Sequence, residues 1–203
     1  MTQRLRLRIC LMDPSKSHIL YENSLAEEFG VSRTPVRQVL QRLAFEHQVE
    51  TRTGVGTVVP QLTQDGLAQD IRLFSGLLTL AAQTTDNTMT SSAQSHLSLL
   101  EGRTNATVSY DKTDTNDLFE TYSWLIEFTR LLITEPIISD MSAALFWRVL
   151  RRMLQKDQTS IDAQRRVLNQ LCKALMALQD PRAALRLISV AADNLSNLSY
   201  DTP

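Results

Sequence analysis

The stretch LAEEFGVSRTPVRQVLQRLAFE, residues 25–46, contains two short amphipathic segments separated by one glycine. Apolar residues in each segment recur at helical spacing, so both segments should form helices with one buried face. Gly30 can adopt the left-handed conformation that ends the first helix, and Ser32 stands where the second helix needs a cap. The pattern therefore predicts a helix over 22–29, a tight turn, and a second helix that runs to about Glu46.

The second predicted helix has a core face and a hydrogen-bonding face. Its apolar residues fall on one side at helical spacing, and they are Val36, Leu40, Leu43 and Ala44. On the other side, Arg33 and Arg37 lie one turn apart, where their guanidinium groups can fork onto guanine edges or phosphate oxygens. Ser32 and Thr34 place short hydroxyl groups beside the first backbone amides of the helix, an arrangement that suits phosphate contact.

A glycine-rich turn, GVG at residues 54–56, follows the second helix. β-Branched residues flank this turn within residues 49–59, which is the pattern of a β-hairpin. Before the two helices, the sequence predicts a helix over about 2–12, closed before Pro14, and a short extended piece over 18–20. The predicted order is therefore helix, helix, tight turn, helix and hairpin, which is the order of a winged helix-turn-helix. In such a domain the second helix of the helix-turn-helix motif can enter a DNA major groove.

The spacing of residues 25–43 strongly resembles the DNA-binding domain of the GntR family of bacterial transcription regulators. The resemblance rests on the order Ser-Arg-Thr-Pro-Val-Arg at 32–37 and on the glycine hairpin downstream, and it covers roughly the first sixty residues. In that family the second helix reads the major groove of an operator and the wing approaches the adjacent minor groove. The resemblance implies as DNA contacts Arg33, Thr34, Arg37 and Gly54.

Four further residues complete the predicted DNA-binding set. Gln38 and Gln41 lie on the polar helix face and can read base edges, while Ser32 and Thr53 stand beside the helix start and the wing tip. The alternative interpretation is that the arginines form a solvated helix face and that the winged helix is a scaffold that binds protein.

Two positions depart from the family pattern. Asn23 stands where many relatives carry an arginine in the first helix of the motif. Residues 13–17 replace a common proline-glycine turn and leave Lys16 as a substitute backbone contact.

Composition excludes several classes of protein. The chain has 203 residues, 43% of them hydrophobic, with only six glycines and six prolines, so long helices are expected and a disordered or mainly β chain is not. No apolar run is long enough to span a membrane and the first residues lack a signal-peptide pattern, which predicts a cytoplasmic protein without a membrane partner. Cys10 and Cys172 lie far apart and are predicted as buried structural thiols.

Charge is distributed unevenly along the chain. The formal net charge is −1, but residues 1–62 carry eight Lys or Arg against six Asp or Glu. The positive excess therefore lies at the amino-terminal end, where DNA contact is predicted.

A domain boundary is predicted near residues 60–63, where β-like alternation stops. We assign residues 1–62 to the DNA-binding domain and 63–203 to a helical domain for effector binding and dimerisation. The second domain contains six amphipathic segments at about 64–84, 91–102, 115–134, 136–157, 160–179 and 181–198. The predicted fold class is therefore mainly α, a winged helix-turn-helix followed by an all-helical antiparallel bundle, with its longest break at 102–112. Residues that favour helix caps are Thr63, Ser160 and Asp180.

The helical domain is similar to the FCD effector domain that follows some GntR-type readers. The resemblance rests on helix number and length and on fragments at 71–73, 134–138 and 174–184. Many FCD domains bind a divalent metal through one Asp and three His. The four matching positions here are Tyr122, Ile126, Asn169 and Ala191. Because two of these side chains lack a donor and Tyr and Asn are weak ligands for transition metals, we expect a degenerate metal site and no cofactor.

An effector pocket for a small carboxylate-bearing molecule is predicted in the bundle, where aromatic rings and guanidinium groups should face one another. The pocket candidates are Tyr122, Arg148, Arg152, Arg166 and Asn169. In the alternative interpretation, the aromatic residues are core packing and the arginines lie on the surface.

These features predict a sequence-specific transcriptional regulator. One recognition helix covers only a few base pairs, so we expect a homodimer on a pseudo-palindromic double-stranded operator, with a small organic-acid-like molecule as a candidate effector. The alternative is an interaction scaffold whose winged helix no longer reads DNA. An enzyme is not expected, because the sequence offers no nucleophile–base pair, metal cluster or glycine-rich phosphate loop.

Overall fold

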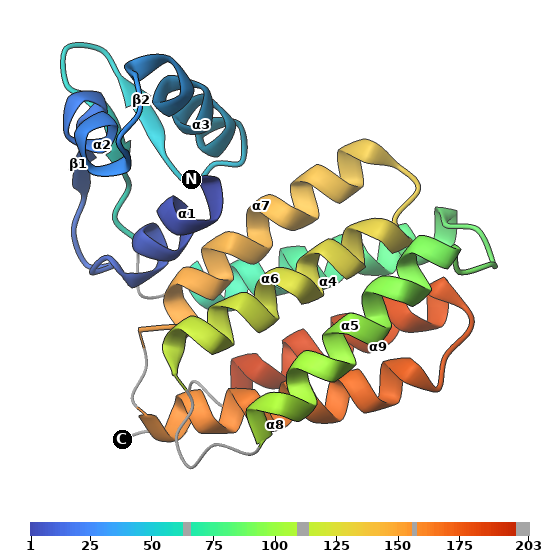
Figure 1. The fold of residues 1–203 in the computed structure, drawn as a ribbon. Helices are drawn as coiled ribbons and strands as arrows, with labels where there is room; N and C mark the ends of the chain where they lie inside the picture. The colour runs from blue at the N-terminus through green and yellow to red at the C-terminus, as the bar shows by residue number, and fades with distance from the viewer. Residues whose placement is uncertain (63–65, 109–113, 156–157, 198–203) are drawn as a thin grey trace.

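The structure, a computed structural model, describes residues 1–62, 66–108, 114–155 and 158–197. Figure 1 shows a small domain of helices and one short sheet beside a larger bundle of long helices. Helices dominate both domains, which confirms the predicted fold class.

The small domain has the element order of a winged helix-turn-helix. Its elements are α1 (Thr2–Leu11), β1 (His18–Leu20), α2 (Glu22–Phe29), α3 (Arg33–Phe45), β2 (Glu50–Arg52) and β3 (Gly56–Val59). The strands form one antiparallel sheet in the order β1-β3-β2, with Ile19 opposite Val58 and Thr51 opposite Thr57. Each helix ends within one residue of its predicted end, so apolar spacing and turn chemistry were sufficient to place them.

The core of the small domain is built from the apolar faces that the sequence indicated. Val36, Leu40 and Leu43 of α3 belong to one buried cluster with Leu25 of α2 and Val59 of β3. Burial of each large apolar side chain contributes roughly 1.5–3 kcal/mol. This core fixes the rotation of α3 about its axis, and the polar face of α3 is therefore held outward.

The larger domain contains the six predicted helices. They are α4 (Gly66–Thr84), α5 (Ser91–Val108), α6 (Thr115–Leu132), α7 (Pro136–Met153), α8 (Gln158–Met176) and α9 (Pro181–Asn197). The Asp180 carboxylate accepts a hydrogen bond from the backbone N–H of Arg182 at 3.0 Å, which confirms the predicted cap. Ser160 is not a cap, because α8 begins two residues earlier, and Thr63 lies outside the described residues.

The predicted break at 102–112 is wrong over its first part, because α5 continues to Val108. Thr104 is buried, and its hydroxyl donates to the backbone carbonyl of Glu101 at 2.9 Å, so the helix itself satisfies this polar side chain. Helix α5 packs along both α6 and α8. This packing outweighs the low helix propensity of the Thr and Asn residues in the segment. Residues 109–113 lie outside the described residues.

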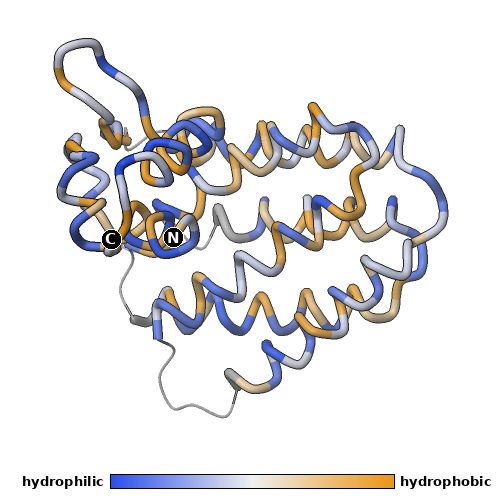
Figure 2. The backbone as a smooth tube through the Cα atoms, turned by 45° about the horizontal axis from the view of Figure 1, so that its top comes forward, coloured by the Kyte–Doolittle hydropathy of each residue, from blue (hydrophilic) through white to orange (hydrophobic). Residues whose placement is uncertain are grey.

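Buried apolar side chains fill the bundle between its helices. Helix α4 packs along both α7 and α9, and Phe119 and Phe128 of α6 are completely buried. Figure 2 shows hydrophobic and hydrophilic residues alternating along the helices, as expected for helices with one buried side. Cys10 and Cys172 are both buried, as predicted. Within the described ranges, every helix falls short of the length and apolarity that a membrane crossing needs.

Helix α1 joins the two domains. Ile9 lies in the core of the small domain, whereas the next residue, Cys10, belongs to the buried cluster of the bundle. The Arg6 guanidinium stacks over the ring of Trp147 in α7, 4.8 Å from its centroid, and pairs with Glu46 at the end of α3. The end of α3 is thus linked to α7 through one side chain of α1.

The core of the small domain can be tested by substitution. Leu43 is fully buried, and Leu43→Ala should lower the free energy of unfolding by about 2–5 kcal/mol, because apolar contacts are lost and a cavity remains. Phe45→Ala on the same helix is the matched control, since Phe45 is 71% exposed, and it should change this free energy by less than about 0.5 kcal/mol. Chemical denaturation followed by circular dichroism measures both variants. Equal losses would contradict the assignment of the buried face.

Candidate nucleic-acid interface

The polar face of α3 is exposed along the helix. Arg33, Arg37 and Gln41 recur at four-residue spacing, with Thr34 and Gln38 beside them. The side chains of the predicted set that are exposed on α3 and at its start are Ser32, Arg33, Thr34, Arg37, Gln38 and Gln41. The structure therefore presents all six together on one helix, opposite the core face.

The turn before α3 fixes where this helix begins. Gly30 has a φ of +64°, and its backbone N–H donates to the carbonyls of Ala26 and Glu27 at the end of α2. Glycine adopts this left-handed conformation without steric cost. Ser32 occupies the predicted N-cap position in an extended conformation, but its hydroxyl makes no capping hydrogen bond. The first backbone N–H groups of α3 are thus not capped by Ser32 and can donate to a phosphate oxygen.

Arg37 is held by a bidentate ion pair with Glu22, the first residue of α2. Its Nη2 and Nε donate to the two carboxylate oxygens at 2.9 and 3.2 Å. These hydrogen bonds lower the pKa of the Glu22 carboxyl, and Arg33 adds a weaker electrostatic contribution. The Arg37 side chain is 60% exposed, so solvent screens the pair and its contribution to stability is small. The main consequence is geometric, because the pair orients the guanidinium plane near the start of α3.

The wing is a tight hairpin between β2 and β3. Gly54 and Gly56 have φ values of +76° and +114°, and the backbone N–H of Val55 donates to the carbonyl of Arg52 at 3.0 Å. Thr53 and Gly54, the two predicted wing contacts, are exposed at this turn. A glycine at the tip lets another backbone approach closely.

The structure adds one cation that sequence reasoning missed. Arg52 precedes the wing turn, is exposed, and pairs with Glu50 of the same strand at 2.9 Å. Because Arg52 directly precedes Thr53, a predicted wing contact, the sequence contained a signal that could have identified it. Lys16, the predicted substitute contact, is exposed and pairs with Asp13 at 3.3 Å. Asn23 lines an open groove with Ser32 and Arg33, so the position that departs from the family pattern borders the start of α3.

Of the five candidates for an effector pocket, Arg148 and Arg152 meet at Asp70, whereas Tyr122 borders a separate cavity. Tyr122 is buried, and its hydroxyl donates to Gln164 at 3.3 Å beside a small apolar cavity of about 30 Å³. Arg148 lies on a different cavity, between the two domains. Arg166 is exposed, and Asn169 has a buried side-chain oxygen without a hydrogen-bond partner among the described residues.

Asp70 of α4 determines where Arg148 and Arg152 lie. Its carboxylate is buried and contacts Arg148 Nη2 at 2.9 Å and Arg152 Nη2 at 3.7 Å. Burial raises the pKa of Asp70, and the two arginines oppose that rise. The sequence contained a signal for this cluster, because Asp70 follows Leu67 by three residues and precedes Phe74 by four on the apolar side of its helix. A carboxylate on a core face needs a cationic partner.

The positions that match the family metal site lie among apolar neighbours. Ile126 is buried in the bundle core, and Ala191 lines the same small cavity as Tyr122. Over the ranges that the structure describes, no three His, Cys, Asp or Glu side chains gather as metal ligands do.

Comparison with known proteins finds similarity over the small domain. Residues 2–59 match the family model described as bacterial regulatory proteins, gntR family. The gluconate operon transcriptional repressor of Bacillus subtilis (strain 168) is 42% identical over 72 residues, which span 34% of this chain and 29% of that protein. The match thus covers less than a third of the relative's length. Over residues 2–59 the small domain, a winged helix-turn-helix, is therefore similar to the regulators of the gntR family.

Two solved structures have the same fold over nearly the whole chain. E. coli McbR/YncC superposes with a TM-score of 0.68 at 20% identity and covers 98% of this chain and 95% of its own. A transcriptional regulator GntR from Rhodococcus sp. RHA1 has a TM-score of 0.62 at 16% identity and covers 100% of this chain and 97% of its own. The arrangement of winged helix and helical bundle is therefore found in other proteins.

The Glu22–Arg37 pair predicts a pH effect. Because the pKa of Glu22 is lowered in the folded chain, the pair stabilises the fold above the ordinary glutamate pKa, and this contribution is lost as the pH falls through the lowered value. Arg37→Met should raise the pKa of Glu22 toward its ordinary value, as measured by carboxyl-detected NMR titration. Arg8→Met, which removes the partner of Glu28, is the control and should leave the Glu22 titration unchanged. An unchanged Glu22 pKa in Arg37→Met would show that the two side chains are not paired in solution.

Proposed function

We propose that this chain is a sequence-specific DNA-binding transcriptional regulator of the GntR type. The observation that carries the proposal is the exposed polar face of α3, with two arginines one turn apart, in a domain that matches the GntR family. The gluconate operon repressor, which is similar over 72 residues, is a transcriptional repressor, and this supports the same class of function here. In this proposal α3 lies in the major groove and the wing follows the adjacent minor groove.

The residues divide into two chemical roles. Arg33, Arg37, Gln38 and Gln41 reach base edges, because guanidinium and amide groups can bind guanine and adenine in a bidentate manner. Phosphate oxygens are bound at the start of α3 by Ser32, Thr34 and the first backbone N–H groups, and at the wing by Thr53 and Gly54. The Glu22 carboxylate orients Arg37 for this contact.

The proposed assembly is a homodimer joined through α4 and α7. Leu73, Leu80 and Met141 are each 45% or more exposed, and they line an apolar groove of about 500 Å³ with Leu77 and Leu145. Contiguous exposed apolar surface of this kind marks interaction sites. A second copy is the occupant that the function requires, since a two-fold operator needs two recognition helices and an isologous contact supplies them symmetrically.

The helical domain is proposed to be of the FCD type without the metal ligands of that subfamily. Its six helices and the full-length structural likeness support the assignment. The small cavity beside Tyr122 is apolar and has room for little more than a water molecule, so it offers no charged group to an organic acid.

Selection from random duplex DNA tests the function. The full-length protein should enrich one pseudo-palindromic sequence, because each recognition helix reads one half-site. On that duplex, the affinity should exceed the affinity for a scrambled duplex by about a thousand-fold or more at physiological salt. If the protein is instead a scaffold, no sequence will be enriched at any salt concentration, and the proposal is wrong.

Arg37→Ala tests the base-reading role. The variant should bind the selected duplex more weakly by about 1–3 kcal/mol and lose its preference at one base pair in each half-site. Arg8→Ala is the matched control, because Arg8 is an exposed arginine of α1 that pairs with Glu28 of α2. This variant should leave the base preference unchanged. Electrophoretic or fluorescence titrations against single-base variants of the duplex measure both. Uniform weakening across all duplexes would reassign Arg37 to phosphate contact.

Leu73→Glu tests the dimer. A carboxylate at the centre of a buried apolar contact is desolvated without a partner, so the variant should be a monomer near 22.9 kDa where the natural chain is a dimer. Leu99→Glu is the matched control, because Leu99 is a comparably exposed leucine on α5. Light scattering at micromolar concentration gives the mass. A monomeric natural chain that does not double on the selected duplex would contradict the assembly.

A further inference from the structure

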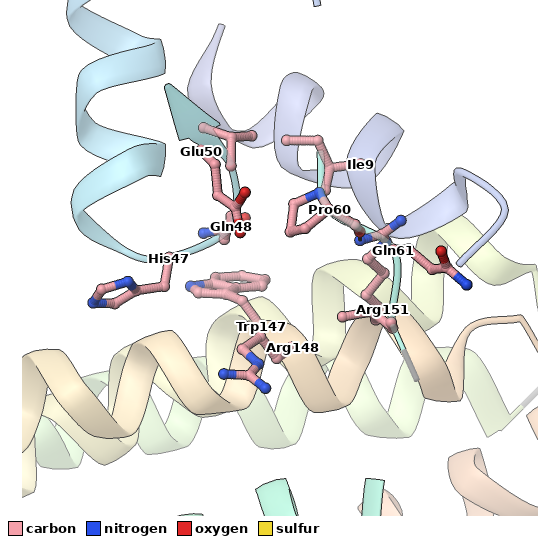
Figure 3. Close-up of a pocket in the computed structure, with 11 residues that line it drawn as sticks. Ile9, His47, Gln48, Glu50, Pro60, Gln61, Trp147, Arg148 and Arg151 are labelled. Carbon is pink, nitrogen blue, oxygen red and sulfur yellow. Dashed lines mark hydrogen bonds between the residues drawn. The ribbon is translucent and has the colours of Figure 1, made fainter. Parts of the chain in front are cut away.

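A cavity of about 260 Å³ lies between the two domains (Figure 3). His47, Gln48 and Glu50, which follow α3, lie on one side of it, and Pro60 and Gln61 lie on another. Val49 and Leu62 also line the cavity. The floor comes from Trp147, Arg148 and Arg151 of α7. Its volume is close to the lower end of the range for ligand pockets, roughly 300–1,000 Å³.

The wall of this cavity holds a buried cation, Arg151, that forms no ion pair among the described residues, although the Asp13 carboxylate acts on it from a greater distance. Arg151 is only 4% exposed, and its Nη1 and Nη2 donate to the backbone carbonyls of Pro60 at 2.6 Å and Asp13 at 3.5 Å. Among the described residues, no carboxylate lies within ion-pair distance of this guanidinium, and its Nε has no hydrogen-bond partner. Arg148 beside it differs, because Asp70 balances its charge. Burial lowers the pKa of Arg151 and the Asp13 carboxylate offsets this only in part, so an anion in the cavity would find a favourable partner in Arg151.

The remaining wall is partly apolar. Ile9, Val49, Leu62 and the indole of Trp147 line the cavity near Arg151. Gln48 is 6% exposed and lines the same space, and its side-chain oxygen accepts no hydrogen bond from the described residues. The chemistry therefore fits a molecule with an anionic end and an apolar body.

We propose that this cavity binds a small organic anion, with its carboxylate or phosphate on Arg151 and its apolar part against Trp147. Such a molecule contacts the segment after the recognition helix and α7 of the bundle at the same time. It would therefore favour one orientation of the DNA-binding domain relative to the bundle, and so change DNA affinity. This regulatory consequence rests on the proposed function, whereas binding to the cavity does not.

Isothermal titration calorimetry of the full-length, DNA-free protein tests the binding site with benzoate, propionate, inorganic phosphate and neutral benzyl alcohol. Benzoate should bind and benzyl alcohol should not. If benzoate binds more tightly than phosphate, the apolar wall of the cavity contributes to ligand binding. If phosphate binds more tightly, the site is specific for phosphate groups. In a Trp124→Phe background, Trp147 is the single tryptophan of the chain, and its emission should change as the anion binds.

Two substitutions with opposite effects locate the site. Arg151→Met should weaken anion binding roughly ten-fold or more, because a charge-assisted hydrogen bond is lost, and Arg151→Lys should restore part of it. Glu50→Gln removes a negative charge from the same wall and should tighten binding, a gain that misfolding cannot imitate. Lys173→Met, an exposed cation on α8, is the matched control. No binding by any of the three anions, or binding that neither Arg151→Met nor Glu50→Gln alters, overturns the proposal.

The effect of the bound anion on DNA affinity is measured separately. Benzoate at saturation should change the affinity for the selected duplex by about five-fold or more in the natural chain and leave Arg151→Met unaffected. If the chain binds benzoate but no DNA, the proposed function fails while the anion site stands. If it binds both without coupling, the regulatory consequence is overturned.

Discussion

Helix α1 lies in two hydrophobic cores at once, and the relation between the two domains depends on it. Leu5 and Ile9 are buried with the recognition helix, whereas Cys10 is buried with the bundle. Between them, Arg6 stacks on Trp147 and pairs with Glu46. A single helix of ten residues thus sets both the position of α3 within its domain and the position of that domain on α7.

Because α1 belongs to both cores, it also gives the chain a means of coupling its two domains. Because interiors are closely packed, a shift of α1 disturbs both cores. Beside α1, Arg151 of α7 binds the carbonyls of Pro60 and Asp13, which lie at the end and near the start of the small domain. The contacts between the domains thus include apolar residues of α1 and the polar contacts of Arg6 and Arg151, and they border a cavity. Polar contacts around a cavity are easier to rearrange than an apolar core, and this is why we place regulation at this junction.

The sequence predicted the small domain well and the bundle's internal contacts poorly, for physical reasons. Gly30 and the glycines of the wing adopt positive φ angles that few other residues tolerate, so short-range patterns were sufficient for α2, α3 and the hairpin. The end of α5 was misplaced because its helix depends on packing against α6 and α8, which no local pattern reports. The predicted effector pocket failed to assemble for a similar reason. Arg148 and Arg152 turn toward Asp70 of α4, which packs beside α7 but lies far away in the sequence. The position of Asp70 on an apolar helix face indicates that it needs a cationic partner, but helical spacing does not show which arginines supply it.

The central claim is that the exposed face of α3 and the wing lie on DNA, and cleavage by a tethered iron chelate tests it most directly. Cys10 and Cys172 are buried, and burial raises the pKa of Cys10 to about 12, so a single cysteine introduced at the surface can be labelled selectively. Chelates attached at Gln41→Cys on α3, Thr53→Cys on the wing and Leu99→Cys on α5 would be compared on the duplex recovered by selection. The account predicts cleavage centred in each half-site from Gln41 and at the neighbouring minor groove from Thr53, and none above background from Leu99. Cleavage from the first two sites that is no stronger than from Leu99 would contradict it.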